Sequence, residues 1–271
     1  MLVLRYMLLV LFGACSLPAV AERIVTLGGT VTEIVFGLGG GADVVAVDQS
    51  SLYPPEVRRL PSVGYYRQTP VEGVAAAQAD LVLASENAGP PEALARLRSL
   101  GLTVRTMPDD GTLESLYQRI AAVAAAVGRE EQGRRLSARI REDLQRAARL
   151  PGRALSTAVL MYRGSQFQLA GEGTSAHQLL ALAGLRNVHQ GRRGYTTLAT
   201  EGLASLDPEL IVITQASLDS AGGMSAFMRL PGVGLTRAGR SQRILVMDDL
   251  LILGIGPRVG QAVEQLKRAA S

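Results

Sequence analysis

A short loop holds the residues that are best suited to bind a metal ion or a metal-containing group. Two tyrosines, Tyr65 and Tyr66, directly follow a glycine and directly precede Arg67. A guanidinium beside a phenol favours the charged phenolate, through opposite charge and hydrogen bonding. A phenolate is a hard oxygen donor that suits ferric iron, and tyrosine is a known axial ligand of haem. The alternative interpretation is that the rings only plug the base of a loop.

The histidines and the cysteine offer little to other kinds of metal site. The chain has two histidines, His177 and His189, and one cysteine, Cys15. This inventory excludes a three-histidine zinc or manganese site. His177 falls in an apolar helical pattern, which favours a packed or capped histidine. His189 lies in a polar loop with no second ligand at useful spacing.

The sequence lacks the signatures of several common enzyme classes. The G-x-S-x-G elbow of a serine hydrolase does not occur, and no isolated pair of carboxylates stands out. The G-x-G-x-x-G order of a dinucleotide site is also missing, because the glycines at 39–41 close a predicted helix instead of opening it. We therefore predict no catalytic residues and favour a binding protein; an exported α/β enzyme is the alternative from another class.

A helix predicted over residues 130–150 lies between two similar halves of the chain. Leu136, Ile140 and Leu144 form one narrow apolar stripe, which suits a helix on the outside of two lobes that it joins. An ordinary surface helix within one domain fits this segment equally well. Opposite charges four residues apart are expected to pair along it: Glu130/Arg134, Glu131/Arg135, Arg139/Asp143 and Glu142/Arg146.

Two segments on either side of that helix match each other without a gap. They are residues 72–83 and 201–212, and each opens with a Glu-Gly pair, at Glu72 and at Glu201. Each is predicted to form a short helix, a turn and a buried strand. The repeated unit indicates internal duplication.

The rest of the pattern alternates strands and helices, as expected for α/β lobes. The loop that carries Tyr65 is predicted to end in a capping box at Thr69–Glu72, which would hold it on a rigid helix end. Thr30 or Thr32 is expected to cap the first helix. Strands are predicted at residues 23–27, 44–47, 80–84, 102–107, 158–162, 211–214 and 244–247, and further helices at 91–100, 113–127, 174–183 and 260–270.

The first 21 residues have the pattern of a secretory signal peptide. Arg5 gives a positive start, residues 7–12 form a short apolar run, and Ala19-Val20-Ala21 gives an A-x-A cleavage site. The apolar run is shorter than the about 20 residues that span a bilayer. Cleavage would remove the only cysteine, so the exported chain would contain no disulfide. A lipoprotein anchored through Cys15 is disfavoured, because no leucine stands three positions before it.

Charge composition argues against a nucleic-acid partner. The formal net charge is +4, and Lys267 is the only lysine, so arginine carries nearly all of the positive charge. The arginines are spread along predicted helices and balanced by acidic residues, whereas a nucleic-acid-binding surface gathers them. Arginine does suit recognition of carboxylates by paired hydrogen bonds.

Several motifs together resemble the periplasmic haem-binding proteins of bacterial haem ABC importers, which are class III, helical-backbone substrate-binding proteins. The resemblance spans nearly the whole exported chain. It implies two Rossmann-like α/β lobes, residues 22–128 and 151–271, joined by one long backbone helix over 129–150, with the ligand cleft between the lobes. The motifs are Arg23–Ile34, Val45–Asp48, Tyr53-Pro54, Leu60–Gln68, Glu72-Gly73 and Met247–Arg258.

The resemblance also implies roles for single residues of the haem pocket. In that family the tyrosine directly after the glycine, here Tyr65, is the axial haem ligand, and Tyr66 is the fallback. Arg67 would hydrogen-bond to the ligand tyrosine or pack beside it. Tyr195 follows Gly194 and occupies nearly the mirror position, where it would line the opposite wall. Some relatives have a histidine ligand in the second lobe; no residue here matches it, so single axial ligation is expected.

The resemblance finally implies a transport partner. Glu72 and Glu201 match the acidic residues that dock on the importer permease, although helix-start carboxylates are also favoured by about 0.3 to 1 kcal/mol through the helix dipole. We expect a monomeric periplasmic protein that delivers haem to an ABC importer with its ATPase, downstream of an outer-membrane haem receptor system. A siderophore or corrinoid carrier of the same fold is the alternative.

Overall fold

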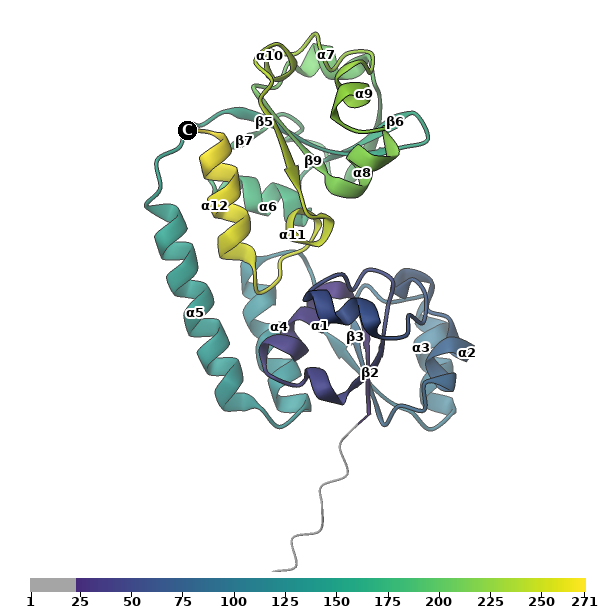
Figure 1. Cartoon of the computed structure of the whole chain (residues 1–271). Helices are drawn as coiled ribbons and strands as arrows, with labels where there is room; N and C mark the ends of the chain where they lie inside the picture. The colour runs from purple at the N-terminus through teal and green to yellow at the C-terminus, as the bar shows by residue number, and fades with distance from the viewer. Residues whose placement is uncertain (1–22) are drawn as a thin grey trace, which may run out of the picture.

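Two β-sheets covered by helices form two lobes, and one long helix connects them. The computed structural model describes residues 23–271, so the predicted signal peptide lies outside the described residues. Helix α5 (Glu130–Ala148) runs beside both lobes and packs against α4 (Leu113–Ala126) of the N-terminal lobe and α12 (Val259–Ala269) of the C-terminal lobe (Figure 1). The predicted fold class is confirmed. Within residues 23–271, no helix is long and apolar enough to cross a membrane.

The N-terminal lobe is a three-layer α/β unit around a parallel sheet of strand order β2-β1-β3-β4. Alternate strand residues face opposite sides. Ile24 and Leu83 pack towards α1 and α4, whereas Val25 and Val82 pack towards α2 and α3. The elements are β1 (Ile24–Leu27), α1 (Gly29–Gly37), β2 (Val44–Val47), α2 (Val71–Ala76), β3 (Leu81–Ser85), α3 (Pro91–Ser99) and β4 (Thr103–Met107), with 3₁₀ turns at Gly41–Asp43, Pro55–Arg59 and Tyr66–Gln68.

The C-terminal lobe has a mixed sheet of order β10-β9-β5-β6-β8, and a short strand, β7, pairs with the start of β5. The β10, β9, β5 and β7 pairings are parallel, whereas β6 and β8 add an antiparallel extension. The strands are β5 (Ser156–Arg163), β6 (Gln166–Ala170), β7 (Arg186–Asn187), β8 (Tyr195–Ala199), β9 (Leu210–Thr214) and β10 (Ile244–Met247). The sequence pattern predicted β5, β9 and β10 but missed β6, β7 and β8.

Helices cover both faces of the second sheet as well. Val159 and Val212 belong to a core cluster shared with α6, α11 and α12, whereas Leu160 and Ile213 pack with α7 to α10. The shared cluster continues through α5 and α4 into the N-terminal lobe, so one apolar core joins the two lobes. The helices are α6 (Ser175–Leu182), α7 (Gly202–Leu206), α8 (Gln215–Ser220), α9 (Met224–Met228), α10 (Arg237–Arg240) and α11 (Asp249–Leu253).

The connecting helix has the predicted narrow apolar stripe but different charge pairs. Leu136 and Ile140 are buried, and Leu144 is partly buried. One expected pair, Glu131 with Arg135, is present. The other three are wrong, because side chains three residues apart are equally within reach on an exposed helix face. Arg134 pairs with Glu131, and Arg146 with Asp143.

Candidate ligand-binding site

The loop that presents Tyr65 is fixed to the carboxyl end of β2. The Val63 amide donates to the Val47 carbonyl at 2.9 Å, and the Gln49 amide donates to the Gly64 carbonyl at 2.8 Å. These contacts join the loop to the neighbouring segment on both sides of Gly64. Backbone hydrogen bonds therefore fix the part of the loop that directly precedes Tyr65.

A glycine is required directly before Tyr65. Gly64 has a φ of 106°, which L side chains rarely adopt, and an added Cβ would lie 2.7 Å from Pro70 Cγ. The predicted capping box after the loop is wrong. The Thr69 hydroxyl donates to the Tyr66 carbonyl at 2.7 Å, and Pro70 stands at the N-cap of α2 with no side-chain cap. The helix thus begins one residue later than predicted, and the Thr69 hydroxyl braces the loop instead of capping the helix.

The two adjacent tyrosines have different environments. Tyr65 is 43% exposed, whereas Tyr66 is half-buried among the outer core of the N-terminal lobe. The rings meet edge to face with centroids 5.3 Å apart. Burial raises the pKa of Tyr66 to about 12, and the Arg67 charge opposes this only in part. Burial therefore disfavours the phenolate form of Tyr66, and Tyr65 is the more accessible of the two rings.

The Arg67 guanidinium lies beside the ring of Tyr66. Its carbon is 5.1 Å from the centroid of that ring. Its charge also acts to lower the pKa of Tyr195, which belongs to the other lobe. Arg67 thus lies near the boundary between the lobes.

Tyr195 opens strand β8 of the C-terminal lobe and faces this same region. It is 38% exposed, yet burial raises its pKa to about 12, with Arg67 opposing. Tyr65, Tyr66 and Arg67 share one loop, and the charge of Arg67 acts on Tyr195 of the other lobe, so this loop lies near the lobe boundary.

Direct contacts show how the lobes face each other. Gly29 follows β1, and a Cβ added to it would lie 2.9 Å from the Leu250 side chain, which follows β10. Gly111 follows β4, and a Cβ there would lie 3.2 Å from the Ser175 hydroxyl at the start of α6. The carboxyl ends of the parallel strands in both sheets therefore point towards the lobe boundary, where α/β folds place ligands.

A buried arginine that the sequence analysis missed joins the lobes. Arg119 of α4 is fully buried, forms an ion pair with Asp109, and donates to the Thr30 hydroxyl at 3.2 Å and to the Ile255 carbonyl at 2.8 Å. The last bond crosses from the N-terminal to the C-terminal lobe. Its only sequence signal is that Arg119 interrupts the apolar face of a helix.

A second polar junction involves the end of the Met247–Arg258 motif. Arg258 donates through Nε to Glu33 Oε1 at 2.8 Å, and its Nη2 lies 3.2 Å from Asp248 Oδ1. Burial raises the pKa of Glu33, and the hydrogen bond and charge of Arg258 oppose the rise. The guanidinium carbon lies 3.9 Å from the ring centroid of Tyr53. The motif therefore forms part of the lobe boundary, a role that spacing alone does not indicate.

The two histidines make local hydrogen bonds in the C-terminal lobe. His177 Nδ1 lies 3.2 Å from the Asn187 side-chain nitrogen, and His189 Nε2 contacts the Thr196 hydroxyl. Burial, and then the nearby Arg192 charge, lower the pKa of His189. Within residues 23–271, no three His, Cys, Asp or Glu side chains gather closely enough to hold a metal ion.

The two glutamates of the repeated unit lie at corresponding helix starts. Glu72 is in the first turn of α2, and Glu201 is the N-cap residue of α7. Both side chains are exposed, and neither forms an ion pair within the part of the chain that the structure describes. Neither helix packs beside α5 (Figure 1). Both side chains are free to meet a partner.

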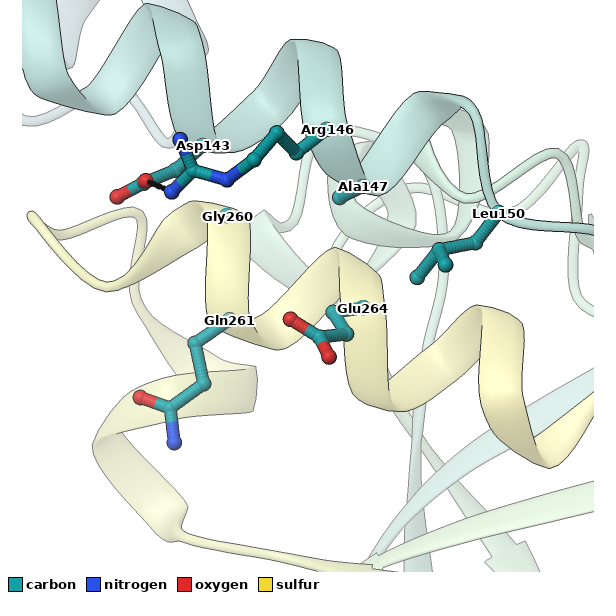
Figure 2. A pocket seen from close by; sticks show the side chains of 7 residues that line it. All are labelled: Asp143, Arg146, Ala147, Leu150, Gly260, Gln261 and Glu264. Carbon is teal, nitrogen blue, oxygen red and sulfur yellow. Dashed lines mark hydrogen bonds and ion pairs between the residues drawn. The ribbon is translucent and has the colours of Figure 1, made fainter.

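A groove of about 380 Å³ between α5 and α12 contains none of the predicted site residues (Figure 2). The two helices cross closely there, since a Cβ added to Gly260 would lie 2.6 Å from the Asp143 Cβ. The groove has a mixed polar and apolar lining and lies on the connecting helix. Its lining residues are Asp143, Arg146, Ala147, Leu150, Gly260, Gln261 and Glu264.

Comparison with known proteins agrees with this architecture. The family described as periplasmic binding protein matches residues 24–251. The apo structure of the periplasmic heme-binding protein RhuT from Roseiflexus sp. RS-1 is 36% identical and covers 92% of this chain and 99% of its own, with a TM-score of 0.85. This similarity confirms the resemblance that the sequence motifs indicate.

Two curated relatives widen the range of ligands to be considered. An ABC transporter substrate-binding lipoprotein of Bacillus subtilis, YvrC, is 27% identical over 90% of this chain and 78% of its own length. The vitamin B12-binding protein of Vibrio cholerae is 33% identical over 47% of this chain and 46% of its own length. This chain therefore aligns with about half of that B12-binding relative.

Proposed function

Because the chain belongs to the periplasmic binding protein family, we propose that it captures haem between its lobes through Tyr65 and delivers it to an ABC importer. Proteins of this family serve as substrate-binding components of transport systems, which fits a carrier and not an enzyme. The proposed location is the periplasm, after removal of the signal peptide at residues 1–21.

The observation that carries the proposal is the exposure of Tyr65 on a rigid loop at the lobe boundary. Three of the six large hydrophobic side chains that are exposed within residues 23–271 are tyrosines, namely Tyr53, Tyr65 and Tyr195. Tyr53 lies under Arg258 of the other lobe, Tyr195 lies near Arg67, and Tyr65 stands on the loop that carries Arg67. Exposed aromatic rings suit a flat apolar ligand, and a phenol oxygen suits ferric iron. Tyr65 would be the single axial ligand.

Arg67 supplies positive charge between the lobes in this proposal. The cation lies near two phenols, and a positive charge favours the ionised form of a nearby phenol. It also suits a carboxylate of the ligand, because a guanidinium forms paired hydrogen bonds with that group. Tyr66 would support the Tyr65 ring by edge-to-face packing, and Tyr195 would cover the ligand from the other lobe.

A corrinoid is the second candidate ligand, because relatives named vitamin B12-binding proteins match this chain. The exposed phenol favours haem, since its oxygen supports ferric iron directly. A siderophore is a further candidate ligand, because siderophore carriers can have the same fold.

The proposed partners follow from the family. A permease with its ATPase would receive the haem, and Glu72 and Glu201 would dock the two lobes on it. An outer-membrane haem receptor system would supply haem upstream, and the carrier would act as a monomer.

Titration of the purified protein with hemin tests the proposal, with cyanocobalamin as the competing ligand. We expect a saturable Soret band and the spectrum of a high-spin ferric haem bound by tyrosinate. Saturable binding of cyanocobalamin without a hemin complex would replace haem by a corrinoid. Binding of neither tetrapyrrole would overturn the proposed function.

A further inference from the structure

Tyr53 is an exposed aromatic residue at the lobe boundary to which the motifs assign no role. Its side chain is 40% exposed, nearly as much as that of Tyr65. It belongs to the segment between β2 and the 3₁₀ turn at Pro55–Arg59. A large apolar ring left open to solvent in this position needs an explanation.

The segment that carries Tyr53 lies against the loop of Tyr65. Asp48 accepts hydrogen bonds from the Gly28 amide at 3.0 Å and the Ser50 amide at 2.8 Å, which ties the segment to the turn between β1 and α1. The Gln49 amide then donates to the Gly64 carbonyl, next to Tyr65. The two tyrosines therefore project from adjacent loops at the same edge of the N-terminal sheet.

A charge network across the lobes fixes one side of the Tyr53 ring. The Arg258 guanidinium lies over the ring at 3.9 Å from its centroid. That guanidinium is itself held by Glu33 of the N-terminal lobe and Asp248 of the C-terminal lobe. The Arg258 side chain is only 15% exposed and that of Glu33 only 3%. A cation over an aromatic face is attractive, and here both of its acidic partners limit its movement.

We propose that Tyr53 is a second aromatic contact for the planar ligand, and that Arg258 is the residue that positions its ring. This inference rests on the proposed function, since the ligand is the tetrapyrrole held by Tyr65. The guanidinium covers part of the ring, and the exposed remainder packs against the tetrapyrrole. Tyr53 thus recognises the flat ring system, whereas Tyr65 recognises the iron.

The two roles separate when the same protein is titrated with hemin and with metal-free protoporphyrin IX. Tyr53→Leu removes the ring and should weaken binding of both by about tenfold, the order expected for one buried aromatic contact. The ferric spectrum of its hemin complex should stay that of wild type. Tyr65→Phe should change the hemin spectrum and leave protoporphyrin affinity within about twofold. Tyr53→Phe keeps the ring and should bind both like wild type.

A second arginine lies over a tyrosine ring elsewhere in the chain and provides a matched control for loss of the ring. Arg141 lies over Tyr117 at 4.4 Å, between α5 and α4 and outside the proposed site. Tyr117→Leu should leave both affinities unchanged. Equal affinities for wild type and Tyr53→Leu would overturn the inference, and so would a wild type that binds hemin but not protoporphyrin. An equal loss in Tyr117→Leu would also overturn it, because the effect would then be one of stability.

The positioning role of Arg258 is tested by a change that keeps its charge. Arg258→Lys retains a cation for Glu33 but loses the planar guanidinium that stacks on Tyr53. Affinity for both tetrapyrroles should fall about threefold, with an unchanged ferric spectrum, whereas Arg141→Lys should have no effect. Wild-type affinity in Arg258→Lys would remove its positioning role. Absence of hemin binding by the wild type would instead overturn the proposed function itself.

Discussion

The two lobes share an arrangement of parallel strands and helices, and they differ in the segments added to that arrangement. In the N-terminal lobe, Arg23 and Asp80 exchange hydrogen bonds: the Arg23 amide donates to the Asp80 carboxylate at 2.9 Å, and the Asp80 amide donates to the Arg23 carbonyl at 2.8 Å. In the C-terminal lobe, Ser156 and Glu209 do the same at 2.9 Å and 2.7 Å. Each pair joins the start of a central strand to its parallel neighbour. The similarity of the two matching segments therefore extends to individual hydrogen bonds.

The turns before these acidic residues also correspond. Gln78 has a φ of 50° and Asp207 a φ of 38°, and both stand six residues after the glutamate of the Glu-Gly pair.

The lobes differ at the sheet edge. Strand β1 pairs with β2 alone on one side, whereas β5 pairs there with β7 and then with β6, which is joined by β8. Tyr195 begins β8, so it stands on an addition that the first lobe lacks.

The strands and helices that the lobes share orient the two lobes, whereas the two glycine-tyrosine pairs stand on segments that the lobes do not share. Tyr65 stands on a loop anchored to β2, and Tyr195 on a strand anchored to β6. Both follow a glycine with positive φ, Gly64 at 106° and Gly194 at 74°. The comparison therefore predicts unequal roles for two tyrosines in similar places.

The largest expected effect separates these tyrosines. Tyr65→Phe should weaken hemin binding on the order of 100-fold, about 2.7 kcal/mol, and abolish the tyrosinate spectrum, because the iron loses its only protein ligand. Tyr195→Phe and Tyr66→Phe should reduce affinity by about threefold or less, since both changes keep the aromatic ring and only the Tyr65 phenol is expected to reach the iron. Hemin titrations of the three variants measure this. Equal losses would remove the special role of Tyr65.

The next effect requires both lobes together. Reversing Glu72 and Glu201 to arginine should lower haem uptake about tenfold or more in vesicles that carry the partner importer, because repulsion would act at both ends of one docking surface. Single alanine changes should be mild, since an exposed ion pair contributes only about 0 to 1 kcal/mol.

Hemin affinity of the doubly reversed protein is the control and should match wild type. Loss of hemin binding would place the glutamates in the pocket or the fold, and wild-type uptake would leave them as ordinary helix-start residues.

A smaller contrast is expected between the two glycines. Gly64→Ala places a methyl group against Pro70 in addition to the unfavourable φ, so it should lower the free energy of unfolding by about 2 kcal/mol or more and shift Tyr65. Gly194→Ala meets no atom within 4 Å, so only the backbone strain of about 1 kcal/mol applies. Denaturant unfolding and hemin titration of both variants measure the difference. A larger effect at Gly194 would contradict the unequal anchoring of the loops.

The smallest effect concerns how the stability of the C-terminal lobe depends on acid pH through Glu209. Hydrogen bonds from the Ser156 amide and hydroxyl, with nearby arginines, lower the pKa of Glu209 below its usual 4.5. The folded state therefore favours the carboxylate, so its contribution is complete above about pH 4.5 and is lost as the pH falls below that value. Glu209→Gln should cost about 1 kcal/mol at pH 7 and progressively less towards pH 3. Thermal unfolding of Glu209→Gln and wild type between pH 7 and pH 3 measures this loss of stability, and Asp80→Asn is the corresponding variant of the first lobe. A stability difference between Glu209→Gln and wild type that persists at pH 3 would contradict the prediction.

Local sequence patterns predicted much of the frame. Alternating apolar residues and turn signals predicted β1 to β5, β9 and β10 close to their observed bounds. The largest difference is at β5, which begins two residues before the predicted start. The repeated Glu-Gly units gave two corresponding helices and strands. The strand β6 was missed because Gln166–Ala170 is short and mixes polar and apolar residues, and its stability comes from pairing with β5 and β8. The capping box failed because Thr69 bonds to the preceding loop.

The α/β class, the two similar strand-and-helix units and the glycine-tyrosine loop could be predicted from sequence patterns, because each depends on residues close together in the chain. Three contacts could not: Arg67 lies over Tyr66, Arg119 bonds to the Ile255 carbonyl, and Arg258 joins Glu33 to Tyr53. Those partners are up to 225 residues apart in the chain. Periodicity and turn chemistry act over a few residues, whereas which charged side chains meet between lobes depends on how the completed sheets and helices pack.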